Sequence, residues 1–160
     1  LGCALGFFTL ILFTCNVSQK SIMAIKHLSI INEVSLIIGL VLLVIGNFLG
    51  GIWANESWGR YWGWDPKETW AYISIIVYTI ILHVRLIPKW YSLYLFALLS
   101  VLGFASILMT YFGVNFYLAG MHSYATGDPV PIPTWVYVAC ALVLSLILFS
   151  YKNRTLKEKK

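Results

Sequence analysis

Long apolar runs alternate with short polar segments along the chain. No formal charge occurs between Glu33 and Glu56, between Glu68 and Arg85, between Lys89 and Asp128, or between Asp128 and Lys152. A helix needs about 20 mostly apolar residues to cross the hydrocarbon core of a membrane. The pattern therefore predicts five spanning helices, over residues 1–17, 31–54, 66–86, 90–112 and 133–151.

The composition agrees with a membrane protein. Of the 160 residues, 60% are hydrophobic and 11% are charged, whereas a soluble domain carries about 25% charged residues. The expected fold class is an all-α polytopic integral membrane protein, with residues 1–160 as a single membrane domain and a short interfacial tryptophan-rich segment. The chain begins with Leu1 in an apolar run, and we expect it to be part of a longer polypeptide.

The basic residues indicate the orientation. With five crossings, nine of the eleven fall on one side of the membrane, and Arg60 and Lys67 fall on the other. Because basic loops stay cytoplasmic, the tail 152–160 is expected inside and the loops 55–65 and 113–132 outside. Attraction to anionic membrane lipid explains the net charge of +5, so nucleic-acid binding is not expected.

Tryptophan is concentrated in the first outward loop and its flanks. Five of the seven tryptophans lie between residues 53 and 70: Trp53, Trp58, Trp62, Trp64 and Trp70. An interfacial aromatic belt is one interpretation, but a belt needs only one or two rings at each helix end. If a short helix continues through this loop, Trp58 and Trp62 share one face, and Tyr61 and Trp64 lie on an adjacent face. Together these rings would form a plate that suits a flat conjugated ligand.

Asp65 and Glu68 flank Pro66-Lys67 at the start of the third span, where two carboxylates invite a catalytic interpretation. We favour a structural one: Asp65 as the N-cap and Glu68 as the third helical residue of a capping box, with a ligand role open in addition. Arg60 and Lys67 are the outward cations, and are candidates to pair with carboxylates on a ligand.

Two of the three histidines are candidate ligands to a metal or haem iron. His83 lies about 27 Å along the third span from Asp65, near the cytoplasmic end of the hydrocarbon core; a snorkelling or hydrogen-bonded role beside Arg85 is the alternative. His122 lies in the second outward loop, expected on the same side as the tryptophans; taken without them, it would be interpreted as an ordinary loop histidine. His27 lies in a cytoplasmic stretch and is expected to be structural.

The run at residues 58–70, WGRYWGWDPKETW, resembles the WWD motif of haem-handling membrane proteins. With the preceding IWANE it is similar to the CcsA (ResC) family of the System II pathway of cytochrome c biogenesis. YFGVN at 111–115 and GMHSY at 120–124 are also similar to that family. The resemblance covers roughly residues 33–151, and residues 1–32 match only in hydropathy.

The resemblance implies that the protein moves haem b outward as its substrate and attaches it to apocytochrome c at C-x-x-C-H, a cytochrome c synthase (haem lyase) activity. It implies that the segment 53–70 holds haem outside, that His122 ligates the iron there as the catalytic residue, and that His83 ligates it within the membrane. Expected haem contacts come from the aromatic and charged residues of that segment: Trp53, Trp58, Arg60, Tyr61, Trp62, Trp64, Asp65, Lys67 and Trp70.

One histidine of each pair implied by the resemblance has no counterpart here, and would lie upstream of Leu1. We therefore expect the C-terminal part of CcsA or of a CcsB–CcsA fusion, acting with a CcsB-like (ResB) partner and thiol-reducing proteins. The expected location is a bacterial inner membrane, with the chloroplast thylakoid as the alternative. Rival functions are a b-type electron-transfer protein, a transporter of another solute and a purely structural subunit of a biogenesis complex.

Overall fold

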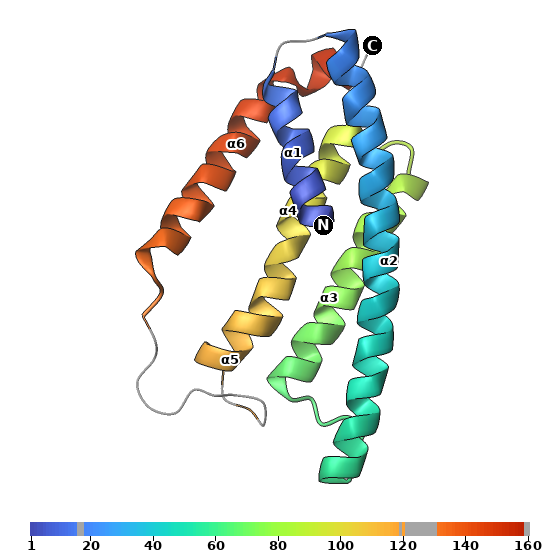
Figure 1. The fold of residues 1–160 in the computed structure, drawn as a ribbon, viewed down its shortest axis with the longest axis vertical. Helices are drawn as coiled ribbons and strands as arrows, with labels where there is room; N and C mark the ends of the chain where they lie inside the picture. The colour runs from blue at the N-terminus through green and yellow to red at the C-terminus, as the bar shows by residue number, and fades with distance from the viewer. Residues whose placement is uncertain (16–17, 119, 121–130, 159–160) are drawn as a thin grey trace. The chain divides into compact units, whose positions relative to one another are not determined.

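The structure, a computed structural model, describes residues 1–15, 18–118, 120 and 131–158. Every regular element in these ranges is a helix (Figure 1). The elements are α1 (Gly2–Thr14), α2 (Gln19–Trp58), α3 (Pro66–His83), the 3-10 helix η1 (Val84–Leu86), α4 (Leu93–Leu108), the π-helix η2 (Met109–Gly113), α5 (Val114–Tyr117) and α6 (Thr134–Glu158). The expected all-α fold class is confirmed.

Four helical segments are long and apolar enough to cross a membrane: Gln19–Trp58, Pro66–Leu86, Leu93–Tyr117 and Thr134–Lys152. They correspond to the second to fifth predicted spans, so the protein is a multi-pass membrane protein. The first predicted span contains α1, which has 13 residues and is therefore about 20 Å long. That length is less than the roughly 30 Å of a hydrocarbon core.

The contacts between residues divide the chain into two compact units. Unit 1 comprises Leu1–Leu36, Ile81–Leu102 and Pro131–Lys160, and unit 2 comprises Ile37–Ile80 and Gly103–Val130. Of the eleven basic residues, unit 2 contains only Arg60 and Lys67. These are the two that the sequence assigned to the outer side. That orientation, and the grouping of residues 1–160 as one domain, stay predictions.

Unit 1 is built around α1, which lies alongside α6 (Figure 1). Its core joins apolar side chains of α1, α2 and α4: Leu10, Phe13, Ile25, Tyr94, Ala97 and Val101. The Tyr94 hydroxyl donates a hydrogen bond to the carbonyl of Ile147, 3.0 Å away, and the buried Asn32 amide donates one to Ser100 Oγ, 2.9 Å away. Such bonds hold helices together in lipid, where apolar surface alone gives little preference for a neighbour.

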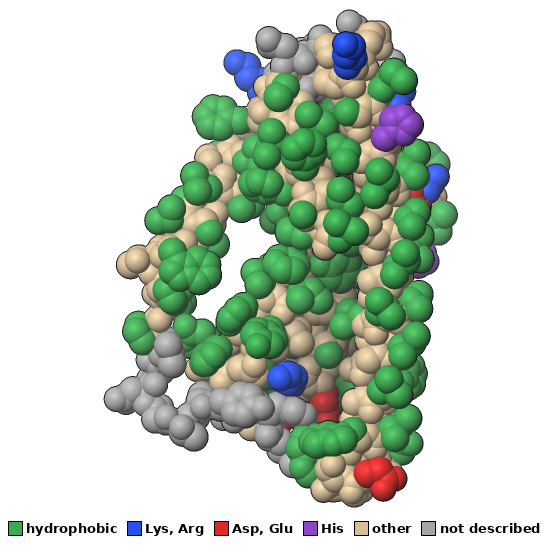
Figure 2. Space-filling view, viewed as in Figure 1, with side chains coloured by type: hydrophobic (Ala, Val, Ile, Leu, Met, Phe, Trp, Pro, Cys, Tyr) green, Lys and Arg blue, Asp and Glu red, His purple; other side chains and the backbone are tan. Residues whose placement is uncertain are grey.

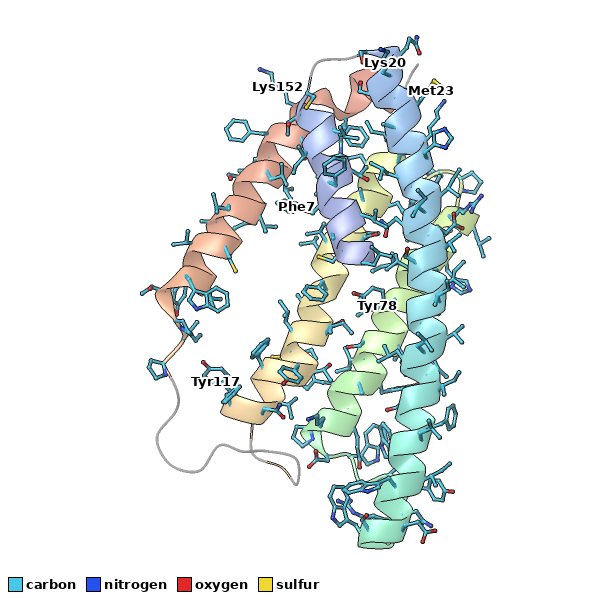
Figure 3. The ribbon with its side chains drawn as sticks, in the orientation of Figure 1. Phe7, Lys20, Met23, Tyr78, Tyr117 and Lys152 are labelled. Carbon is cyan, nitrogen blue, oxygen red and sulfur yellow. The ribbon has the colours of Figure 1, made fainter. Side chains whose placement is uncertain are left out.

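Unit 2 contains the second half of α2, most of α3, and the chain from Gly103 onward that includes η2 and α5. Hydrophobic side chains cover the visible face of α2 (Figure 2). The exposed large apolar residues of α2 in this unit are Ile37, Ile38, Val41, Leu42, Ile45, Phe48, Leu49, Ile52 and Trp53. An exposed apolar face of this length is expected where a helix contacts lipid or further membrane helices.

Candidate functional site

The tryptophan-rich segment forms an irregular connection between α2 and α3. α2 ends at Trp58, and Gly59 takes a φ of 70°, a left-handed conformation that costs glycine little. The Gly59 N–H donates to the carbonyl of Asn55, 2.9 Å away, as in a common helix-ending motif. A helix continuing from Trp58 to Trp62 is therefore absent, and our reason for expecting these rings on one helical face was wrong.

The rings in this segment meet edge to face. Trp53 and Trp58 have centroids 5.0 Å apart with an interplanar angle of 79°. Trp62 contacts Trp64 at 5.7 Å and 89°, and Tyr72 of α3 at 6.3 Å and 81°. The rings thus support one another through favourable edge contacts instead of forming one flat plate.

Three rings of the segment remain open on the surface. Trp64 is 70% exposed, and Trp53 and Tyr61 are 56% and 57% exposed. Trp64 also has a φ of 56°, a strained conformation for a bulky residue that persists only when the surroundings hold it. Trp58, Trp62 and Trp70 are partly buried, and two of them support exposed rings: Trp58 contacts Trp53, and Trp62 contacts Trp64.

The capping box at the start of α3 is present as predicted. Asp65 Oδ2 accepts a hydrogen bond from the Lys67 N–H, 3.2 Å away, and Glu68 Oε2 accepts one from the Asp65 N–H, 3.2 Å away. Pro66 occupies the first helical position, where a missing N–H costs nothing. Asp65 is only 6% exposed. Both carboxylates therefore satisfy N–H groups at the helix start.

Glu68 also reaches back into the tryptophan-rich segment. Its Oε2 accepts a second hydrogen bond from the Gly63 N–H, 2.7 Å away. The Thr69 hydroxyl donates to the carbonyl of Trp64, 3.4 Å away. The first turn of α3 thus holds the backbone on both sides of Trp64, which accounts for its unusual conformation.

The two cations of unit 2 occupy different surroundings. The Arg60 guanidinium lies over Gly63, in space that any side chain at that position would fill. The Lys67 ammonium donates a hydrogen bond to Asn115 Oδ1, 3.2 Å away. Arg60 therefore lies within the segment, whereas Lys67 reaches α5.

Gly120, which follows α5, contacts the start of α3 as well. A Cβ built at Gly120 would lie 2.6 Å from Asp65 Oδ1 and 2.8 Å from Pro66 Cδ, so only glycine fits there. Asn115 and Gly120 belong to the YFGVN and GMHSY motifs of the sequence, but their contacts with the start of α3 were not predicted. The available signals were a glycine two residues before His122 and a polar residue ending an apolar run. His122 itself lies outside the described residues.

His83 is the last residue of α3, and its side chain is exposed. Two residues beyond it, in η1, Arg85 forms an ion pair with Glu33 of α2. In the part of the chain that the structure describes, no three His, Cys, Asp or Glu side chains gather as a metal site would require.

The helices and the capped aromatic segment define a multi-pass membrane protein with an ordered tryptophan-rich connection. The chain belongs to the cytochrome c assembly protein family, whose model matches residues 1–122. The match includes residues 1–32, which hydropathy alone had linked to the family. It agrees with the CcsA-type System II resemblance and with a role in handling haem.

Individual relatives support the same family. The chain is 64% identical over 160 residues to the protein NrfI of Wolinella succinogenes, covering 98% of this chain and 18% of NrfI. It is 46% identical over 99 residues to the cytochrome c biogenesis protein CcsA of Prochlorococcus marinus (strain MIT 9215), covering 62% of this chain and 32% of that protein. For CcsA of Hordeum vulgare the identity is 47% over 94 residues, covering 59% and 29%. The chain therefore spans less than a third of each of these relatives.

Proposed function

We propose that this chain is the part of a CcsA-type cytochrome c synthase that holds haem b at the outer membrane surface and presents it to apocytochrome c. The observation that supports this most is the tryptophan-rich segment. Trp53, Tyr61 and Trp64 are exposed, while hydrogen bonds from the first turn of α3 hold the backbone that carries Trp64. Exposed rings on a held backbone suit a flat, largely apolar macrocycle.

In this proposal Trp53, Trp58, Tyr61, Trp62, Trp64 and Trp70 surround the haem ring or support the rings that do. Arg60 pairs with a haem carboxylate, because its guanidinium lies within the segment and carries a permanent charge. Asp65 and Glu68 hold the segment in shape. His122 ligates the iron outside, together with a histidine from another part of a longer protein.

His83 ligates haem at an inner site, before it moves outward. Its exposed position at the end of α3 supports this assignment, because the second ligand would come from another segment or from a CcsB-like (ResB) subunit. An ionisable side chain in a membrane span is a functional candidate in any case. Thiol-reducing proteins keep the substrate cysteines reduced.

The attachment step is an addition. The histidine of C-x-x-C-H replaces one axial ligand, and each cysteine S–H adds across a haem vinyl group. A C–S bond forms at one vinyl carbon and hydrogen goes to the other, so the addition itself needs no oxidant or reductant. The protein contributes mainly by positioning the reacting groups, and the cofactor supplies the reactivity.

The proposed location is a bacterial inner membrane, with the C-terminal tail in the cytoplasm. The 64% identity to the protein from Wolinella succinogenes, compared with 47% to that from Hordeum vulgare, favours this over a thylakoid. The bias of basic residues supports the orientation. Labelling of cysteines introduced at Ser57 and Thr126 by an impermeant reagent in intact cells tests it, and protection of both positions would contradict it.

Production of a c-type cytochrome tests the function. The full-length protein is expressed with an apocytochrome carrying C-x-x-C-H in a host without its own maturation system. We expect haem that stays attached to the cytochrome after denaturation. Haem that is bound by the membrane protein and reversibly reduced, but never transferred, would instead favour a b-type electron-transfer protein. Absence of haem from the full-length protein would favour transport of another solute.

A further inference from the structure

Three contacts connect α3 to the chain that leads into the second outward loop, and all lie within unit 2. Ser74 Oγ and Thr110 Oγ1 are hydrogen-bonded at 3.1 Å. Lys67 Nζ donates to Asn115 Oδ1 at 3.2 Å. The backbone at Gly120 lies against Asp65 and Pro66. Thr110, Asn115 and Gly120 follow one another along the chain. Their partners Ser74, Lys67 and Asp65 occur in the reverse order, so the two segments run antiparallel.

On the α3 side, the helical repeat explains the alignment. Lys67 and Ser74 are seven residues apart and therefore lie on the same face of an α-helix. Asp65 is the N-cap beyond the same end. We call Asp65, Lys67 and Ser74 the docking face. Ser74 is fully buried and Asp65 nearly so, as expected for polar groups that are held by partners and not by water.

On the segment that contacts α3, an ordinary α-helix would not place Thr110 and Asn115 on the same side. Thr110 and Asn115 are five residues apart, which in an α-helix places them roughly 140° apart around the axis. The π-helix η2 includes Thr110 and ends two residues before Asn115, and the Val114 N–H donates to the carbonyl of Met109, five residues back. This wider turn brings residues five apart towards the same side. The π-helix therefore lets both Thr110 and Asn115 face α3.

The Lys67–Asn115 contact is the central one. Asn115 is only 7% exposed, and a buried amide oxygen without a donor is costly. Lys67 supplies that donor with a charged group, which makes a stronger hydrogen bond than a neutral one. The Lys67 ammonium therefore points to Asn115 of the protein and not to a ligand.

We propose that the docking face holds the chain from Thr110 to Gly120 against the start of α3, and that this contact helps His122, two residues further along the chain, to act as an iron ligand. Lys67 is then a positioning residue, and Arg60 is the cation that meets haem. Gly120 is required because it allows the loop backbone to rest on the capped start of α3, two residues before His122. The consequence for His122 rests on the proposed function, whereas the docking itself does not.

A double-mutant cycle in the full-length protein tests the docking. The variants are Lys67→Met, Asn115→Leu and the double variant, with Lys26→Met as a matched control. The readout is amide hydrogen exchange of residues 113–120 in detergent. We expect each single change to speed exchange about tenfold, since one charged hydrogen bond is lost. The double variant should exchange no faster than the faster single variant.

Additive effects in the cycle, or exchange unchanged from wild type in both single variants, would overturn the docking. Gly120→Ala gives a second, independent test, with Gly39→Ala as its control because a Cβ at Gly39 meets nothing within 4 Å. Faster exchange at residues 113–118 in Gly120→Ala, and not in Gly39→Ala, supports the docking. Equal exchange in both glycine variants would contradict it.

The haem spectrum tests the link to His122. In Lys67→Met and Gly120→Ala we expect the spectrum of a lost axial ligand, restored by added imidazole. A spectrum unchanged from wild type, with faster loop exchange, would overturn the positioning of His122. The wild-type protein could contain no haem while the double-mutant cycle still shows non-additive effects on hydrogen exchange. That result would support the docking and overturn the proposed function.

Discussion

Glu68 Oε2 accepts a hydrogen bond from the Gly63 N–H at 2.7 Å, which ties the first turn of α3 to the middle of the tryptophan-rich segment. The same oxygen accepts the Asp65 N–H at 3.2 Å. One carboxylate therefore caps the helix and also fixes the loop before it. The shape of the aromatic segment consequently depends on a side chain that belongs to the helix.

Removing this carboxylate should loosen the segment. Glu68→Ala leaves two N–H groups without their partner, and we expect a loss of about 2 kcal/mol in the free energy of unfolding. Glu68→Gln keeps an acceptor oxygen and should cost less. Denaturation of the full-length protein in detergent measures both, with the exposed Glu56→Ala as the control. Equal stability of Glu68→Ala and Glu56→Ala would contradict this role.

The end of α2 depends on Gly59. Its φ of 70° is unfavourable for any residue with a Cβ, so Gly59→Ala should lower stability by about 1 kcal/mol. Gly39 lies in the interior of α2, where alanine is a better helix former. Gly39→Ala should therefore leave stability unchanged or raise it. Thermal unfolding of the two variants side by side decides the matter, and a Gly59→Ala protein as stable as wild type would refute the assignment.

The exposed tryptophans allow a matched comparison. Trp64 is 70% exposed and Trp135, at the start of α6, is 68% exposed, so truncation removes a similar exposed ring at each. We expect Trp64→Ala to weaken haem binding about tenfold, within the range of aromatic stacking energies, and Trp135→Ala to leave it unchanged. Haem titration of the full-length variants measures this. Similar losses in both would indicate a general membrane effect.

The fold was largely predictable because membrane crossing imposes a length and an apolar composition that appear directly in the sequence. The uncharged run before Glu56 located the later part of α2, but α2 begins at Gln19 and not near residue 31 as predicted. Pro88 lies just beyond η1, which ends the third predicted span at Leu86. The π-helix at Met109–Gly113 could not be predicted, since MTYFG reads as ordinary apolar helix. Its register depends on partners on α3, which are distant in the sequence.

The site was predictable where the physics is local. The capping box followed from the spacing of Asp65, Pro66 and Glu68, because its hydrogen bonds join neighbours in the chain. The arrangement of the rings did not follow, since Gly59 ends α2 earlier than the spacing of Trp58 and Trp62 suggested. The contact of Lys67 with Asn115 joins residues that are 48 positions apart in the sequence. A local sequence pattern does not predict a pair at this separation.

The inner site has its own test in His83. Its exposed side chain at the end of α3 should ligate haem before outward movement, so His83→Ala should lower the haem carried per protein several-fold. His27→Ala, also exposed, is the control and should leave it unchanged. The haem content of the purified full-length protein measures both. Normal haem content in His83→Ala would contradict the proposal that His83 ligates haem.

The most direct test of the central claim is the absorption spectrum of the purified full-length protein carrying His122→Ala, with His27→Ala as the control. If His122 ligates haem held by the tryptophan-rich segment, the variant should lose haem or its axial ligation, and imidazole should restore the wild-type spectrum. The control should match wild type. A His122→Ala protein with wild-type haem content, spectrum and cytochrome c production would contradict the account.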